Sequence, residues 1–160
     1  MMWNILRRKR LEVRPSSYLT KRTKCEIGQG LYCIEKIPDK NVISLFIGEK
    51  ITVAEWERRK SNKCGGYGVE LTRDVILDCR RAYENGQCFA SAANSYRNLI
   101  NQSSLESSRP NAKLLVKNRM AFLISICDIM PGCEILLDYG VEYKEFLSVE
   151  DQAHLTDFYV

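Results

Sequence analysis

The residues of this 160-residue chain that could carry out chemistry form a short inventory. The single histidine, His154, argues against a histidine-based hydrolase and against a histidine-rich metal centre. The pair Gly28-Gln29-Gly30 could form a tight turn beside a ligand. It is not a phosphate loop, because no G-K-[ST] follows, and it is not a dinucleotide fingerprint, because a strand pattern comes next. Taken alone, such a pair marks a turn more often than a ligand site.

The other reactive side chains are seven cysteines, whose arrangement predicts reduced thiols. Their number is odd, no C-x-x-C pair occurs, and Cys127 ends an apolar run that begins at Leu123. A zinc site needs about four ligands held close together, and these spacings do not provide them. Buried, reduced cysteines are typical of intracellular proteins. We therefore predict no metal, and a location in the nucleus or the cytoplasm.

The length suits one domain, and a hydrophobic fraction of 45% is enough for a core. Part of the net charge of +4 comes from the basic run at residues 7–10, which could be a nuclear address, a nucleic-acid contact or a solvated terminus. We favour the solvated terminus and expect no direct nucleic-acid binding. No secretory signal is visible, and no segment approaches the roughly 18 apolar residues of a membrane-spanning helix, so no membrane partner is expected.

Short apolar runs separated by turns predict a mainly β domain, because long helices do not alternate with the strands. One helix is expected at residues 52–60, where Thr52 and Glu55 form a capping-box pattern and Trp56 lies on the buried side. The polar segment 97–111 is typical of a long surface loop. The tail from residue 142 to 160 has helical spacing. Strands are expected at residues 11–14, 31–34, 42–47, 69–71, 75–78, 114–116 and 121–126, with a further apolar segment at 134–140.

Four segments in a fixed order resemble the motifs of the SET-domain family of protein lysine methyltransferases. Residues 28–32 are similar to the family's G-x-G-[LV]-[FY], and residues 46–48 to its Y-x-G. Asn94-Ser95 with Pro110-Asn111 looks like its N-H-S…P-N. Residues 128–140 resemble D-I-x-x-G-E-E-[LI]-x-x-D-Y-G, which is the most specific of the four. The order of the set is a stronger signal than any single member.

The resemblance covers residues 11–143 and leaves a basic segment at 1–10 and a helical tail at 144–160. It implies a SET fold, in which several small curled β-sheets and few short helices surround a threaded, pseudoknot-like C-terminal segment. It also implies transfer of methyl groups from S-adenosylmethionine to a lysine side chain of a protein substrate, with a histone tail as one candidate. In this family the cofactor and the lysine enter from opposite faces.

The resemblance assigns roles to individual residues. Backbone groups of Gly30, Leu31 and Tyr32 would contact the cofactor, and Asn94 would hold it by hydrogen bonds. Tyr139 would be the catalytic tyrosine at the point of transfer and would also touch the cofactor. Methyl transfer to a neutral amine needs alignment and a dry channel rather than a metal or a covalent nucleophile. A tyrosine hydroxyl can orient the sulfonium methyl by weak C–H···O contacts.

On the substrate side, Phe46, Leu71 and Leu137 would line the lysine channel. A peptide would add as a strand beside residues 69–71. Leu137 stands where the family often has an aromatic residue, so we expect space for more than one methyl. Relatives close this channel with cysteine-rich zinc segments that are absent here. We expect the tail aromatics to close it instead, or to pack as an ordinary amphipathic helix; they are Phe146, Phe158 and Tyr159.

Three departures from the family pattern leave a second function open. Phe46 replaces the usual tyrosine and removes one hydroxyl, and Ser95 replaces the usual histidine. The loop between Asn94 and Pro110 is also longer than the family's short form. These changes keep open a catalytically weak or silent SET-like module that binds a peptide or the cofactor.

Overall fold

The computed structural model describes residues 10–61 and 67–138 of the chain. The expectations for the basic segment, for Tyr139 and for the aromatic tail therefore lie outside the described residues. Within the described residues, no helix is both long and apolar enough to cross a membrane. The elements in chain order are β1 (Leu11–Pro15), β2 (Tyr18–Thr20), β3 (Gln29–Cys33), β4 (Val42–Leu45), β5 (Glu49–Thr52), α2 (Val53–Ser61), β6 (Gly68–Thr72), β7 (Val75–Asp78), α3 (Arg80–Glu84), the 3-10 turn η1 (Ala90–Ala92), β8 (Asn94–Ser95), β9 (Leu99–Asn101), β10 (Ala112–Lys117), β11 (Met120–Ser125) and β12 (Glu134–Asp138).

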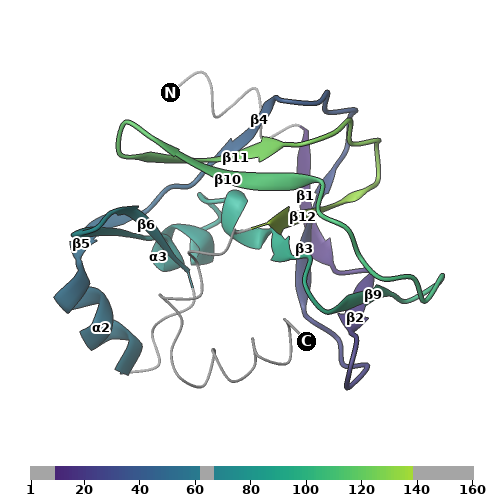
Figure 1. Ribbon diagram of the computed structural model, residues 1–160, viewed down its shortest axis with the longest axis horizontal. Coiled ribbons are helices and arrows are strands. Elements are labelled where there is room, and N and C mark those ends of the chain that lie inside the picture. Colours follow the sequence, from purple (N-terminus) through teal and green to yellow (C-terminus); the bar gives the residue numbers. More distant parts are fainter. Residues whose placement is uncertain (1–9, 62–66, 139–160) are drawn as a thin grey trace.

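These strands form three small sheets, which confirms the expected mainly β fold. The largest sheet has the order β1-β3-β12-β10-β11-β4, with β8 attached to β12. A three-stranded sheet has the order β5-β7-β6, and β2 pairs with β9 alone. In Figure 1, α2 lies beside the three-stranded sheet, whereas β2 and β9 lie at the other end of the molecule.

Strand β12 changes neighbours along its length. At its start it runs antiparallel to β3, where Ile135 pairs with Leu31. From Leu136 onward it runs parallel to β8 on one side and to β10 on the other. Because β8 and β10 are joined by residues 96–111, β12 lies inside the loop that this connection closes. This is the threaded arrangement implied by the family resemblance.

The main core collects around β12 and its neighbours. Leu31, Leu123, Ile135 and Leu137 have no exposed surface. Burial alternates along β11, whereas β3 and β12 are buried on both faces over most of their length. The single main cluster extends from β1 to β12. Burial of each of these aliphatic side chains contributes about 1.5–3 kcal/mol to the stability of the fold.

The predicted helix is confirmed as α2, with Trp56 buried in a second, smaller cluster. Its start is fixed by Thr52, whose hydroxyl accepts a hydrogen bond from the Glu55 backbone N–H at 3.1 Å. The reciprocal half of the predicted capping box is not formed, because the Glu55 carboxylate turns to Arg58 and Arg59 instead. The Glu55 carboxylate therefore forms ion pairs within the helix instead of capping its N-terminus.

The segment 97–111 is not the structureless loop that its polar composition predicted. Leu99 and Ile100 are buried in β9, which pairs antiparallel with β2. A strand of three residues is too short to show an alternation of apolar and polar residues in the sequence. Its partner, β2, also lies about 80 residues earlier in the chain. Strand β5 was missed for the same reason, since it is short and runs directly into α2.

Candidate functional site

The turn at Gly28 and Gly30 is shaped by two different requirements. Gly28 has a φ of 87°, a conformation that favours glycine. Gly30 is needed for space, because a Cβ at this position would lie 2.2 Å from Oε1 of Glu134. The second glycine of the G-x-G pattern therefore makes room for a carboxylate of the same protein.

Glu134, the first residue of β12, is 6% exposed and accepts hydrogen bonds from three segments. Its Oε1 lies 2.7 Å from the Ser16 hydroxyl. Its Oε2 lies 3.0 Å from the Ser17 backbone N–H and 3.0 Å from the Tyr32 hydroxyl. The Asn94 amide nitrogen lies 3.4 Å from Oε1. The carboxylate thus joins the β1–β2 connection, β3 and β8 to β12.

The Tyr32 hydroxyl takes part in this cluster as a neutral donor. It accepts from the Ser17 N–H at 2.8 Å and can donate to Glu134 or to the Pro15 carbonyl. Burial is the main cause that raises the pKa of Tyr32, and the nearby Glu134 charge adds to it. The ring is covered by the Arg14 guanidinium, 3.9 Å from its centre.

Asn94 links the two segments that were predicted to hold the cofactor. Its Nδ2 donates to the Gln29 carbonyl at 2.7 Å, so β8 and the Gly30 turn lie in direct contact. Its Oδ1 accepts no hydrogen bond from the described residues, and the residue is partly exposed. A free carboxamide oxygen beside a buried carboxylate suits a ligand that carries amine donors and positive charge. The residues present therefore fit the expected cofactor, although its contacts with Gly30, Leu31, Tyr32 and Asn94 stay a prediction.

The transfer tyrosine, Tyr139, lies outside the described residues, but the strand that leads to it is well fixed. Leu137 pairs with Ser95 on one side and with Ala112 on the other. Asn111 binds β12 like an additional strand residue: its Oδ1 accepts from the Leu136 N–H at 2.9 Å, and its Nδ2 donates to the Glu134 carbonyl at 2.8 Å. The role of Tyr139 in transfer stays a prediction.

The three residues predicted for the lysine channel belong to one buried cluster. Phe46, Leu71 and Leu137 are 4%, 7% and 0% exposed. They come from the end of β4, from β6 and from β12. The sequence pattern therefore identified residues that the fold collects in one apolar region, while their service as a channel stays a prediction.

The backbone that follows Phe46 is held on both sides. The Ile47 N–H donates to the sulfur of Cys88 at 3.3 Å. Gly48 packs so tightly on β7 that a Cβ would lie 2.3 Å from the Asp78 carbonyl oxygen. Glycine is required here by close approach of two backbones.

Cys88 and Cys79 form a buried thiol pair behind this segment, which the sequence patterns did not indicate. Donation from the Cys79 thiol, with the Ile47 N–H, lowers the pKa of Cys88. The same pairing, followed by burial, raises the pKa of Cys79. All six described cysteines are free thiols, as predicted, but Cys25, Cys127 and Cys133 are exposed rather than buried. No three metal-binding side chains converge in the described segments.

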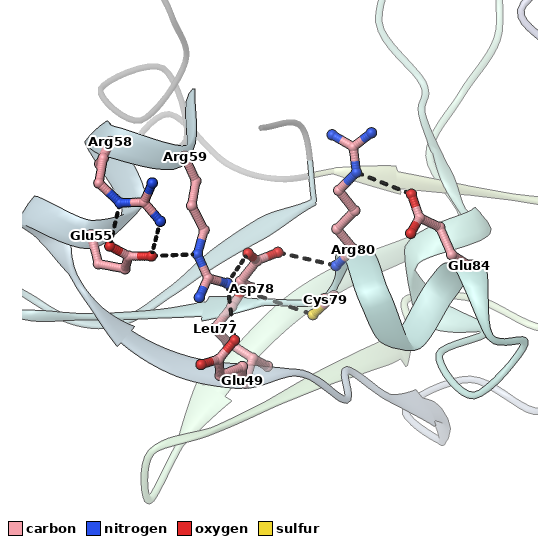
Figure 2. Close-up of polar contacts among 9 residues, drawn as sticks. All are labelled: Glu49, Glu55, Arg58, Arg59, Leu77, Asp78, Cys79, Arg80 and Glu84. Carbon is pink, nitrogen blue, oxygen red and sulfur yellow. Dashed lines mark hydrogen bonds and ion pairs between the residues drawn. The ribbon is translucent and has the colours of Figure 1, made fainter. Parts of the chain in front are cut away.

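An ion-pair network joins α2 to the three-stranded sheet (Figure 2). Arg59 donates to Glu55 at 2.8 Å, to Glu49 at 3.0 Å and to Asp78 at 2.7 Å. Hydrogen bonds from Arg58 and then Arg59 lower the pKa of Glu55 to about 2. The network holds the sheet that contains Leu71 rather than supplying a reactive group.

Comparison with known proteins identifies the family and the fold. The family model for the SET domain matches residues 28–140, more than half of the chain. The structure is similar to the methyltransferase domain of human PR domain-containing protein 2, with a TM-score of 0.55 and 17% sequence identity. The similarity covers 82% of this chain and 77% of that domain, and at this identity it shows the fold alone. No curated protein sequence matches the chain significantly.

Proposed function

Because the chain belongs to the SET-domain family, whose members are generally S-adenosylmethionine-dependent methyltransferases, we propose that it methylates a lysine side chain of a protein substrate. The observation that carries the proposal is the meeting of β3, β8 and β12, where the Asn94 amide binds the Gln29 carbonyl at 2.7 Å. This junction brings together the segments to which the resemblance assigns the cofactor, and β12 runs from it to Tyr139.

The main contribution of the chain's own residues would be to orient the bound cofactor. S-Adenosylmethionine would supply an activated methyl group on a sulfonium, together with a neutral leaving group. Asn94 offers its Oδ1 to ligand donors, while its Nδ2 is fixed by Gln29. The hydrogen bonds of Asn111 to Leu136 and Glu134 hold β12 in register. A strand held in this way keeps the end of β12 at Asp138 fixed relative to Asn94, and a displacement at carbon needs such alignment.

The substrate side would use the three-stranded sheet. Strand β6 is at the edge of this sheet, so its outer backbone groups suit an added peptide strand. The lysine would extend from that strand toward the apolar region of Phe46, Leu71 and Leu137. An apolar channel lowers the pKa of a lysine, and the amine must be neutral before it attacks. Phe46 would contribute an aromatic ring to this channel, but no hydroxyl group.

The experiment that tests the proposal is methyl transfer to histones. Purified full-length protein would be incubated with radiolabelled S-adenosylmethionine and core histones, and the labelled residue identified by mass spectrometry. We expect label on lysine, and loss of both label and cofactor binding in Asn94→Ala. Gln102→Ala, an exposed amide outside the junction, is the matched control and should keep both activities. Cofactor binding without label on histones, or on total basic protein, would exclude transfer to these substrates.

Phe46 and Ser95 favour the second candidate, a catalytically weak SET-like module that binds peptide or cofactor. Phe46 offers no hydroxyl near the expected amine position. Ser95 uses its hydroxyl locally, accepting from the Arg97 N–H at 3.4 Å. Phe46→Tyr separates the two candidates, because a restored hydroxyl should raise transfer in a weak enzyme and leave a pure binding module silent. Measurable transfer by the natural protein that Phe46→Tyr does not increase would remove the reason for this candidate.

A further inference from the structure

Glu134 is an unusual group for the centre of a small β-protein. It is a carboxylate with 6% exposure, yet no lysine or arginine of the described residues lies within ion-pair distance of it. Arg14, which is close in sequence to its partners, stacks on the Tyr32 ring and donates to the Gly132 carbonyl. Buried charges are normally paired with an opposite charge. Here all the donors are neutral.

Two of the residues that donate to the carboxylate lie in the connection between β1 and β2. Ser16 and Ser17 hold the carboxylate from the β1–β2 connection, with Ser16 Oγ within 2.7 Å of Oε1 and 2.9 Å of Oε2. Ser17 contributes its backbone N–H at 3.0 Å and its hydroxyl at 3.1 Å. Such a set fixes the position of the carboxylate. The cluster therefore keeps a negative charge at a defined place without neutralising it.

The carboxylate is also in contact with the two cofactor segments. Gly30 packs directly against Oε1, with no space for a Cβ, and Asn94 approaches the same oxygen at 3.4 Å. Displacement of Glu134 would move both segments together. Its charge would act across a water-poor region, where electrostatic interactions are stronger than in solvent.

We propose that Glu134 is a positioning residue for the cofactor, which holds Asn94 and the Gly30 turn in place and supplies the negative charge that favours the sulfonium form over the demethylated product. The inference rests on the proposed function. It assigns to the protein a preference between two ligands that differ by one methyl group and one positive charge.

The test is the affinity of the full-length protein for S-adenosylmethionine and S-adenosylhomocysteine, measured by calorimetry for the natural protein and for Glu134→Gln. The variant keeps the shape of the side chain and removes its charge. We expect binding of S-adenosylmethionine to weaken by about tenfold or more, since charged hydrogen bonds are lost. Binding of S-adenosylhomocysteine should weaken less, so that the ratio of the two affinities falls at least about threefold. If the role of Glu134 were purely structural, the substitution would lower the affinities for both ligands by the same factor.

Two further variants separate charge from position. Ser16→Ala loosens the carboxylate without removing its charge, so both ligands should weaken by the same factor. Asp78→Asn changes another carboxylate that is 6% exposed, in the ion-pair network of Arg59. It should lower the melting temperature and leave both affinities as in the natural protein.

The outcomes distinguish this inference from the proposed function. An affinity ratio in Glu134→Gln that changes less than about threefold would overturn the electrostatic role. If that variant does not fold, Ser16→Ala decides, because unchanged affinity for both ligands would overturn the positioning role. Failure of the natural protein to bind either ligand would remove the proposed function itself, and this inference with it.

Discussion

Replacing Asn111 by alanine is expected to destabilise the fold through loss of two hydrogen bonds to β12. The side chain binds the Leu136 N–H at 2.9 Å and the Glu134 carbonyl at 2.8 Å. Leu136 is 1% exposed, so water cannot easily replace the lost partner. A buried polar group left without a partner costs about 1–3 kcal/mol. We therefore expect a loss of about 3 kcal/mol in the free energy of unfolding.

For a domain of this size, such a loss lowers the melting temperature by about 6–12 °C. Differential scanning calorimetry and urea unfolding of the natural protein and Asn111→Ala would measure both quantities. Asn101→Ala is the matched control, because its Oδ1 accepts from the Ser103 and Ser104 N–H groups in an exposed turn. That variant should lose about 1 kcal/mol or less.

Asn111→Asp gives an internal check on the argument. It keeps the acceptor for the Leu136 N–H but places a carboxylate oxygen against the Glu134 carbonyl oxygen, so its stability at neutral pH should be no higher than that of the alanine variant. If Asn111→Ala lost no more stability than Asn101→Ala, the view that Asn111 fixes β12 would be wrong.

Gly48→Ala should cost about 1–3 kcal/mol in urea unfolding, because its Cβ would meet the Asp78 carbonyl oxygen at 2.3 Å and two backbones must separate; a neutral result would contradict the close approach. Glu55 makes a pH-dependent contribution, since Arg58 and Arg59 lower its folded pKa to about 2 from 4.5. A depressed carboxyl pKa stabilises above the unfolded value, so this contribution should disappear as the pH falls from about 4.5 to about 2. The melting temperature of Glu55→Gln should therefore depend less on pH over this range than that of the natural protein. An equal dependence in the two proteins would exclude the Glu55 ion pairs as its cause.

The sequence alone was enough to predict the longer strands, helix α2 and the family, but not the short strands β2, β5, β8 and β9. Helix α2 was readable because Thr52 and Trp56 act within a few residues of one another. The turn between β10 and β11 is equally local, and the structure gives Asn118 and Arg119 positive φ angles of 52° and 57°. Features of this kind depend on local backbone preferences, which the order of residues already contains.

Tertiary structure decided what surrounds the site. Glu134 stood inside a recognised motif but had no assigned role, because its partners at Ser16, Tyr32 and Asn94 are 40 to 118 residues away in the chain. The reason why position 30 requires a glycine could not be predicted either, because the atom that leaves no space for a Cβ belongs to Glu134. Sequence patterns report periodicity and local turns, whereas the contacts of a buried carboxylate depend on which strands the fold places side by side. The pairing of β12 with β3 and with β8 brings these groups together.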